Sequence, residues 1–305
     1  MSGLDVVTGG AGFIGSHLAE ALLLRGRRVR VVDDFSTGKR GNAPAGAELV
    51  EGDVNAVAKE AVRGADVVYH LAALPSVPRS VERPLESHRA TAQATLAVLQ
   101  ASERAGVRRV VFASSSSVYG DTPTLPKRED MPPRPLSPYA VAKLCGEAYA
   151  RSWAEHTKLE TVSVRFFNVY GPRQDPDSPY AAVIPIFIGR LLGDRPLPID
   201  GDGLQTRDFT FVGDVVLGIL AAAAAPGVSG RVYNLAGGRP ASLLALADAL
   251  ASLLGVRAGK DFRPPRPGDI RDSWADVSAA RRDLGFEART SLEEGLRATV
   301  EWSRT

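Results

Sequence analysis

The chain has 305 residues, enough for one large domain or two smaller ones that share a cleft. Its 44% hydrophobic and 24% charged residues are typical of a soluble globular protein, and its net charge of +2, without clustered arginines, argues against a nucleic-acid partner. The longest apolar run, residues 215–225, is too short to span a bilayer, and the single cysteine, Cys145, excludes disulfides within the chain and argues against a cysteine-based metal site. We therefore expect a cytoplasmic protein with no membrane partner and no bound metal.

The first predicted unit is a strand, a glycine-rich turn and a helix. Residues 4–7 are mostly apolar, Gly9, Gly12 and Gly15 follow, and residues 16–23 have helical spacing. In this context the glycines allow a sharp turn and a close approach of a pyrophosphate to the backbone, and the helix N-terminus offers N–H groups to the phosphates. The next predicted strand ends at Asp33, where a ribose-binding acid is expected. The unit predicts a dinucleotide site, although its glycine spacing differs from the usual G-x-G-x-x-G.

Strand and helix patterns continue to alternate through the first half of the chain. Further strands are predicted over residues 28–32, 48–51, 65–70, 109–113 and 161–166, and long helices over 84–105 and 138–156. Near-continuous apolar strands separated by helices indicate an α/β fold, a Rossmann-like doubly wound parallel sheet.

The composition and periodicity of the sequence change after residue 167. Prolines and glycines become frequent, and short helices (241–254 and 291–302) alternate with short strands such as 231–234. This pattern predicts a smaller C-terminal α/β substrate lobe. The expected domains are residues 1–167 and 168–305, with interleaving of their segments left open.

Two groups of polar residues are predicted to lie at the carboxyl edge of the sheet. Tyr139 and Lys143 are spaced i, i+4 near the start of the 138–156 helix, which puts the phenol and the ammonium on one helix face. A nearby ammonium favours the phenolate and can bring a tyrosine into the range of a general base. A run of four serines, which includes Ser115 and Ser116, follows the 109–113 strand. Together with the glycine turn, these groups indicate a catalytic cleft.

These motifs resemble those of the extended short-chain dehydrogenase/reductase family. The family's T-G-x-x-G-x-x-G turn matches residues 8–15, its S/T-x-x-V-Y-G stretch matches 115–120, and its Y-x-x-x-K matches 139–143. The resemblance covers essentially the whole chain and is greatest to the UDP-hexose 4-epimerases. It implies a UDP-sugar substrate and a homodimer formed through the 84–105 and 138–156 helices.

The resemblance assigns the catalytic roles to Ser115, Tyr139 and Lys143. Tyr139 as phenolate would remove the proton of the sugar 4-hydroxyl while C4 passes hydride to NAD⁺. Ser115 would hydrogen-bond the same oxygen, and Lys143 would hold the nicotinamide ribose. The 4-keto sugar would then turn over and receive the hydride on its other face, so that NAD is regenerated at each turnover.

The resemblance also implies which residues hold the two ligands. The expected NAD contacts are Gly9, Gly12, Phe13, Ile14, Gly15, Asp33, Asp34, Asp53, Val54, Leu71, Ala72, Ala73, Tyr139 and Lys143. The expected substrate contacts are Ser76, Ser115, Ser116, Tyr139, Asn168, Ala182, Val183, Arg207, Arg266, Asp269 and Ser273. Arg207 and Arg266 would flank the diphosphate, because the guanidinium fork suits its oxygens. The acidic pair Asp33 and Asp34 disfavours the additional phosphate of NADP, which makes NAD the expected cofactor.

Two positions bear on the fine geometry of the sugar site. Ser273 stands where a bulky tyrosine confines related epimerases to UDP-glucose and UDP-galactose, so we expect a pocket that also admits an N-acetyl group. Filling of that space by the neighbouring Trp274 is the alternative. Thr91 stands where the family commonly carries an asparagine.

Other reactions of the family are weighed by the residues that they need. UDP-glucuronate 4-epimerisation stays an alternative, with Arg173 as the partner of the carboxylate. Dehydration and decarboxylation are disfavoured, because Ser116 and Ser117 occupy positions where such enzymes carry acids, and a hydroxyl cannot do that acid work. A non-catalytic NAD-sensing protein is disfavoured because Tyr139 and Lys143 are both present.

Overall fold

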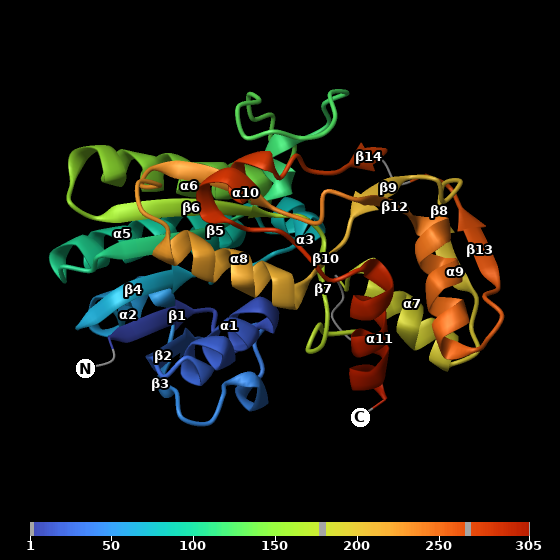
Figure 1. The fold of residues 1–305 in the computed structure, drawn as a ribbon, viewed down its shortest axis with the longest axis horizontal. Coiled ribbons are helices and arrows are strands. Elements are labelled where there is room, and N and C mark those ends of the chain that lie inside the picture. The colour runs from blue at the N-terminus through green and yellow to red at the C-terminus, as the bar shows by residue number, and fades with distance from the viewer. Residues whose placement is uncertain (1–2, 177–180, 266–269, 305) are drawn as a thin grey trace.

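The computed structural model describes residues 3–176, 181–265 and 270–304. Its larger lobe contains a seven-stranded parallel sheet in the order β11-β6-β5-β4-β1-β2-β3 (Figure 1). The strands are β1 (Leu4–Thr8), β2 (Arg28–Asp33), β3 (Glu48–Glu51), β4 (Ala65–His70), β5 (Arg109–Ser115), β6 (Glu160–Phe166) and β11 (Arg231–Leu235). All residues of β1 are buried, as expected for a parallel strand covered on both faces. The predicted doubly wound α/β fold is confirmed.

Helices cover both faces of this sheet. One face packs against α1 (Phe13–Leu24), α8 (Val212–Ala224) and α10 (Ser278–Leu284). The other packs against α2 (Val54–Ala61), α5 (Ala94–Arg104) and α6 (Pro138–His156). The bounds of α6 are those predicted, because the Ser137 side chain caps the Ala140 N–H and Pro138 suits the first helical position.

The helix predicted over residues 84–105 is present as a continuous helical stretch, but it contains a π-helical segment that the sequence did not predict. The structure divides this stretch into α4 (Pro84–His88), the π-helical segment η2 (Arg89–Gln93) and α5, and places α3 (Val77–Glu82) before it. Within it, Thr95 Oγ1 donates to the Thr91 carbonyl at 2.7 Å. Apolar periodicity cannot reveal a π turn, because one extra residue shifts the apolar stripe by a single position.

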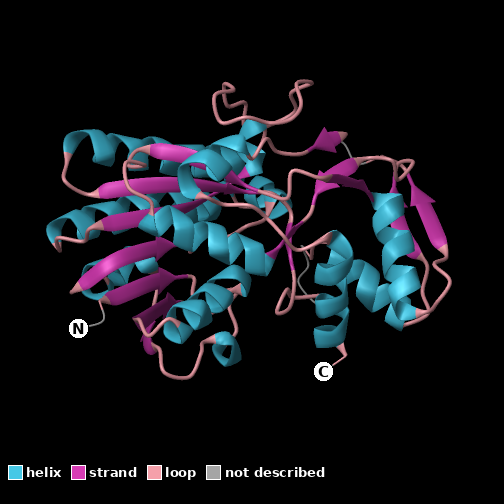
Figure 2. Ribbon diagram, in the orientation of Figure 1, coloured by secondary structure: helices cyan, strands magenta, loops and turns pink. Residues whose placement is uncertain are grey.

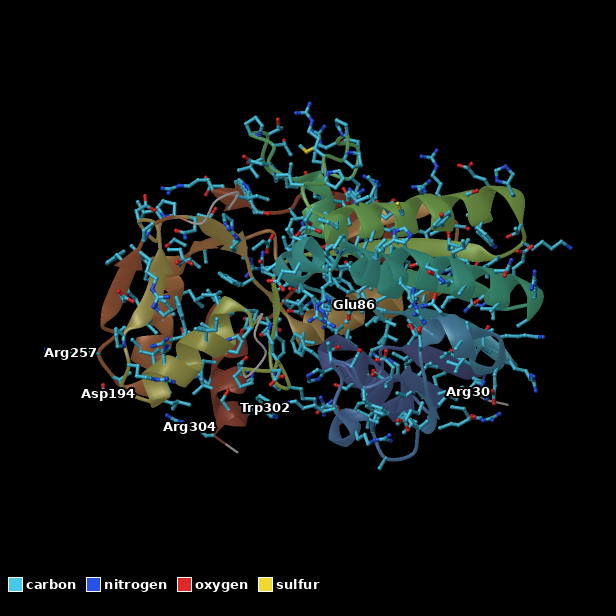
Figure 3. All side chains as sticks on the ribbon, turned by 180° about the vertical axis from the view of Figure 1, so that it is seen from behind. Arg30, Glu86, Asp194, Arg257, Trp302 and Arg304 are labelled. Carbon is cyan, nitrogen blue, oxygen red and sulfur yellow. The ribbon has the colours of Figure 1, made fainter. Side chains whose placement is uncertain are left out.

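The smaller lobe has its own apolar core between α7 (Val183–Leu192), α9 (Leu243–Leu254) and α11 (Leu292–Ser303). Its short strands, separated by loops in Figure 2, are β7 (Val169–Tyr170), β8 (Leu197–Asp200), β9 (Thr206–Asp208), β10 (Thr210–Phe211), β12 (Pro240–Ser242), β13 (Lys260–Arg263) and β14 (Asp272–Ser273). The short helices η1 (Arg40–Asn42) and η3 (Ser116–Tyr119) complete the elements. Seen from behind in Figure 3, Arg257 and Trp302 lie on this lobe, and Arg30 lies on the larger one.

The two lobes interleave, so a boundary at residue 167 does not separate them. The 231–234 strand, predicted in the smaller lobe, is part of β11 and pairs in parallel with β6 in the main sheet. Arg109 of β5, which is only 2% exposed, donates to the carbonyls of Ala222, Ala223 and Ala225 at 2.8–2.9 Å. The larger lobe thus includes β11 as a strand of its sheet and α8 as a helix packed on that sheet. No local pattern in the sequence indicates this arrangement.

Candidate active site

The glycine turn between β1 and α1 is tightly built. Gly9 has φ +69° and donates its N–H to the Val32 carbonyl at 2.7 Å, which holds the turn against β2. A Cβ on Gly15 would overlap the Gly9 carbonyl group, whereas a Cβ on Gly12 would have only the Gly9 oxygen, at 3.1 Å, nearby. Gly12 is the N-cap of α1, and no side chain caps the first turn. The backbone N–H groups of that turn are therefore suited to phosphate oxygens.

Asp33 closes β2 beside this turn. Its carboxylate accepts hydrogen bonds from the N–H groups of Ala11 and Phe35, each at 2.9 Å. Burial raises the pKa of Asp33, and the two N–H groups act in the opposite direction. The neighbouring Asp34 accepts from the N–H and the hydroxyl of Ser36. Asp33 thus lies where the dinucleotide hypothesis requires an acid, beside the glycine turn.

The other predicted NAD contacts lie around this edge of the sheet. Leu71, Ala72 and Ala73 follow β4, and the Leu71 N–H donates to the Thr8 carbonyl at 3.1 Å, which ties them to the glycine turn. Asp53 caps α2 through the Asn55 N–H and pairs with Arg89 at 2.8 Å. The partly buried Phe13 and Ile14 open α1, and Val54 is packed in the core under α2. The roles of these residues toward NAD stay predictions.

The predicted catalytic residues meet where β5 ends against the first turns of α6. Ser115 Oγ accepts from the Ser117 N–H at 3.2 Å, and the Ser115 hydroxyl lies near enough to the Tyr139 phenol to favour its phenolate form. Lys143 Nζ lies 5.8 Å from the centroid of the Tyr139 ring and donates to the Ala113 carbonyl at 2.6 Å. The structure therefore brings together the hydroxyl, the phenol and the ammonium that the sequence predicted.

The expected lowering of the Tyr139 pKa is not found. Burial raises the pKa of Tyr139 to about 12, and the hydrogen bond to Ser115 offsets this only in part. Burial also lowers the pKa of Lys143 to about 7, while the Glu147 carboxylate favours its charged form. The prediction was wrong because it counted the attraction of the ammonium and not the loss of water around both groups.

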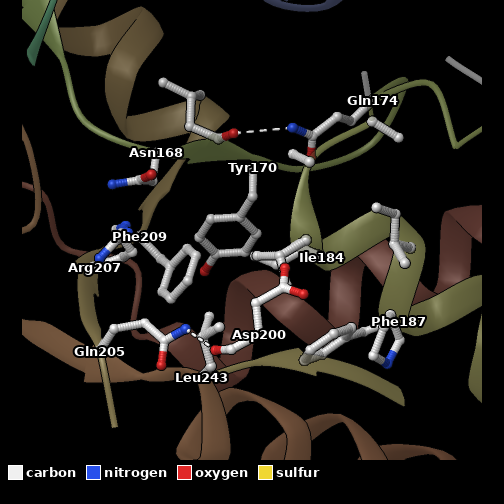
Figure 4. Close-up of a pocket in the computed structure, with 16 residues that line it drawn as sticks. Asn168, Tyr170, Gln174, Ile184, Phe187, Asp200, Gln205, Arg207, Phe209 and Leu243 are labelled. Atoms are coloured by element: carbon white, nitrogen blue, oxygen red, sulfur yellow. Dashed lines mark hydrogen bonds between the residues drawn. The ribbon is translucent and has the colours of Figure 1, made fainter. Parts of the chain in front are cut away.

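A cavity of about 300 Å³ lies in the smaller lobe between β7, β8, β9 and α7 (Figure 4). It is lined by four predicted substrate contacts, Asn168, Ala182, Val183 and Arg207. Asn168 and Arg207 lie on the same side of the cavity as Phe209, and Ile184 and Phe187 lie opposite. The cavity thus combines polar groups, including Asn168 and Arg207, with apolar surface from Ile184, Phe187 and Phe209, a combination that suits a ligand that carries both phosphate and an uncharged base.

Several cavity residues were not found from the sequence. Tyr170, Phe187 and Phe209 supply aromatic rings, and Gln205 lines the cavity two residues before Arg207. Alternation along an extended chain offers a signal for Gln205, because residues i and i+2 share a face. The aromatic residues come from separate elements, and the sequence offers no signal for their convergence.

The remaining predicted substrate contacts are less closely grouped. Ser76 is the N-cap of α3 and accepts from the Arg79 N–H at 3.1 Å, and Ser116 begins η3. Ser273 on β14 lies opposite Arg207 on β9 but does not line the cavity. The predicted contacts Arg266 and Asp269 lie outside the described residues.

Arg173, the predicted partner of a glucuronate carboxylate, points to the larger lobe instead. Its Nη2 pairs with Glu20 of α1 at 2.7 Å, and its Nη1 lies 3.4 Å from Ser16 Oγ. The guanidinium is thus engaged beside the glycine turn.

Comparison with known proteins identifies the family. A model described as the NAD dependent epimerase/dehydratase family matches residues 6–236. The chain belongs to this family. The family resemblance inferred from the sequence motifs is confirmed, and so is NAD as the expected cofactor. The chain is 39% identical to a UDP-glucose 4-epimerase of Mycolicibacterium smegmatis over 98% of each sequence.

Two solved structures show the same fold. A UDP-N-acetylglucosamine 4-epimerase from Methanobrevibacter ruminantium M1, in complex with UDP-N-acetylmuramic acid, has a TM-score of 0.95 at 37% identity, with 100% of both chains covered. MoeE5 in complex with UDP-glucuronic acid and NAD has a TM-score of 0.90 at 40% identity, with 99% of both chains covered. These three proteins are thus named for, or bound to, four kinds of UDP-sugar: UDP-glucose, UDP-N-acetylglucosamine, UDP-N-acetylmuramic acid and UDP-glucuronic acid.

Among residues 3–176, 181–265 and 270–304, no group of three or more His, Cys, Asp or Glu side chains is placed to hold a metal ion. In the same described part of the chain, no helix combines the length and the apolar character that a membrane crossing requires.

Proposed function

We propose that this chain is an NAD-dependent UDP-hexose 4-epimerase of the UDP-glucose 4-epimerase type. The observation that carries the proposal is that the half-buried Ser115 hydroxyl faces the buried Tyr139 phenol, with Lys143 on the next helical turn. A base, a hydroxyl partner and a cation then converge on one sugar hydroxyl.

In the proposed mechanism, Tyr139 takes the proton of the 4-hydroxyl and later returns it. The Ser115 hydroxyl donates a hydrogen bond to the same oxygen and stabilises the negative charge that develops there. Lys143 supplies the positive charge that favours the phenolate of Tyr139, against the burial that opposes it. The glycine turn and Asp33 would hold NAD, which would supply the hydride acceptor for C4. Arg207 and Asn168 hold the diphosphate, and the apolar side chains that line the cavity hold the base.

The test is a panel of UDP-sugars incubated with the protein and read by NMR for inversion at C4. In Tyr139→Phe the turnover should fall by roughly 10²–10⁴-fold while UDP and NAD stay bound, because only the proton transfer is lost. The matched control is Tyr233→Phe on β11, which removes the phenol hydroxyl that donates to Asp283 Oδ2 at 3.1 Å. A Tyr139→Phe protein that keeps more than about a tenth of the rate would remove Tyr139 from the mechanism.

We further propose that the enzyme acts on UDP-glucose and UDP-galactose and also on their N-acetylated counterparts. The small side chain of Ser273, opposite Arg207 on the neighbouring strand, supports room beside the sugar. The UDP-glucuronate alternative loses support, because its expected carboxylate partner, Arg173, is paired with Glu20.

We also propose a homodimer formed by α3, α4 and α6. These helices carry exposed apolar side chains, including Val81, Leu85 and Val141, of which Leu85 is 85% exposed. Sedimentation should give a dimer for the protein and a monomer for Leu85→Glu. Leu24→Glu, at an equally exposed position on α1, is the matched control and should stay dimeric. Dimers from both variants would place the interface elsewhere.

A further inference from the structure

The end of β5 and one face of α6 are paired residue by residue. Tyr139, Lys143 and Glu147 are spaced four residues apart, so their side chains lie above one another on the helix. Each meets the end of the strand: Tyr139 the Ser115 hydroxyl, Lys143 the Ala113 carbonyl, and Glu147 the Ser114 hydroxyl. The first two contacts belong to the proposed catalytic group. The third extends the same row by one helical turn.

Glu147 is held more firmly than an ordinary carboxylate. Its Oε1 accepts from Ser114 Oγ at 2.5 Å and from Arg165 Nε at 2.8 Å, and its Oε2 accepts from Arg165 Nη2 at 2.7 Å. The Glu147 and Arg165 side chains are 5% and 3% exposed. A bidentate pair of this kind fixes the position of the carboxylate as well as its charge.

The charges around Lys143 are few. Burial lowers the pKa of Lys143 to about 7, and the neighbouring carboxylate that opposes this is Glu147. His70 of β4 also faces Lys143, but burial and the ammonium lower its pKa to about 3, so its ring stays neutral near pH 7. The Tyr139 phenol is neutral as well, because burial raises its pKa to about 12. Arg165 of β6 reaches this group through Glu147, and β5 contributes the uncharged Ala113 carbonyl and Phe112 ring.

We propose that Glu147 is a positioning residue of this active site, which keeps Lys143 in its ammonium form and holds α6 in register with the end of β5 through Ser114. The inference rests on the proposed function, because the ammonium matters there for the phenolate of Tyr139. A buried cation needs a fixed anion nearby, and the Glu147 carboxylate is fixed by Arg165. Arg165 thus acts on the catalytic lysine through the Glu147 carboxylate.

The test is Glu147→Gln, which keeps the shape of the side chain and removes its charge. The signals of ¹³Cε-labelled lysine report the pKa of Lys143 directly, and the Lys143 signal is assigned by its loss in Lys143→Met. Without the carboxylate the ammonium is less stable, so the pKa of Lys143 should fall by about 1–3 units. The alkaline limb of kcat for a UDP-sugar should move to lower pH by the same amount, with KM unchanged.

Two further variants separate charge from structure. Ser114→Ala removes one hydrogen bond of Glu147 and no charge, so it should shift the Lys143 pKa less than Glu147→Gln does. Glu147→Gln/Arg165→Gln removes both buried charges together, which guards against misfolding from an unpaired Arg165. It should lower the Lys143 pKa less than Glu147→Gln does, because the positive charge of Arg165 is lost as well. An unchanged Lys143 pKa in both Gln variants overturns the inference, as does an equal shift in Ser114→Ala. The NMR titration needs no turnover, so a wild-type protein that inverts no UDP-sugar refutes the proposed function separately.

Discussion

Gly12 and Gly15 of the glycine turn offer a test that separates cofactor binding from packing. The change is alanine at each position in turn. A Cβ on Gly15 would overlap the Gly9 oxygen and lie 2.8 Å from the Gly9 carbonyl carbon and 2.9 Å from Gly10 Cα. These are backbone atoms of a turn that is held to β2, so they cannot move aside. Overpacking costs ~1–3 kcal/mol, and contact with rigid backbone places Gly15→Ala near 3 kcal/mol.

Gly12→Ala has a different expected result. Gly12 has φ −78°, which alanine adopts without strain, and the nearest atom to its Cβ is the Gly9 oxygen at 3.1 Å. The added methyl group would instead occupy the space in front of the first N–H groups of α1, where the pyrophosphate is expected. A clash of about 2 kcal/mol there weakens NAD binding by roughly 30-fold.

The assay is thermal unfolding together with the NAD content of the purified proteins. Gly15→Ala should lower the Tm by about 6 °C, at roughly 2 °C per kcal/mol for a chain of this size. Gly12→Ala, freed of nucleotide, should melt close to the nucleotide-free wild type and lose NAD on dilution. If Gly12→Ala binds NAD as tightly as the wild type, the pyrophosphate does not lie on this helix N-terminus. If Gly15→Ala melts like the wild type, the backbone around Gly9 can move away from the added methyl group.

Three other predictions follow from particular contacts. Ser273→Tyr should lower turnover of UDP-N-acetylgalactosamine by about 5- to 150-fold and leave UDP-galactose unaffected, as a ring in filled space costs ~1–3 kcal/mol; equal effects on the two substrates would mean that Ser273 is not the gate. Arg109→Leu should lower the free energy of unfolding in urea by about 3 kcal/mol, because it leaves the carbonyls at the end of α8 without a partner. The matched control is Arg108→Leu at the exposed neighbouring position, which should lower it by less than about 1 kcal/mol. Equal losses of stability in the two variants would contradict this account. Lys143→Met should stabilise the NAD-free protein, because the pKa of Lys143 in the folded protein, about 7, lies below its ordinary value of 10.5. The gain in the free energy of unfolding should be absent above pH 10.5, grow by roughly 1.4 kcal/mol per pH unit as pH falls toward 7, and level off below pH 7. A gain that does not depend on pH would refute this prediction.

Local patterns in the sequence were enough for the parts of this protein that depend on neighbouring residues. The glycine turn, Asp33 at the end of β2, and the placement of Tyr139 and Lys143 on one face of α6 follow from turn chemistry and helix period. The bounds of α6 are encoded by Ser137 and Pro138, which act within one turn of its start. These features were predicted because each is fixed by the backbone over a few residues.

The tertiary structure decided what depends on burial and on distant pairing. It returned β11 to the main sheet beside β6, and it assembled the cavity from segments as far apart as Asn168 and Leu243. It also raised the pKa of Tyr139, which the spacing to Lys143 predicted to be lowered, because the loss of water on burial outweighs the effect of the Ser115 hydroxyl. The pairing of Glu147 with Arg165 joins two elements that the sequence gives no reason to connect. Spacing tells which residues share a face, but only the folded chain determines which groups lose water and which partner replaces it.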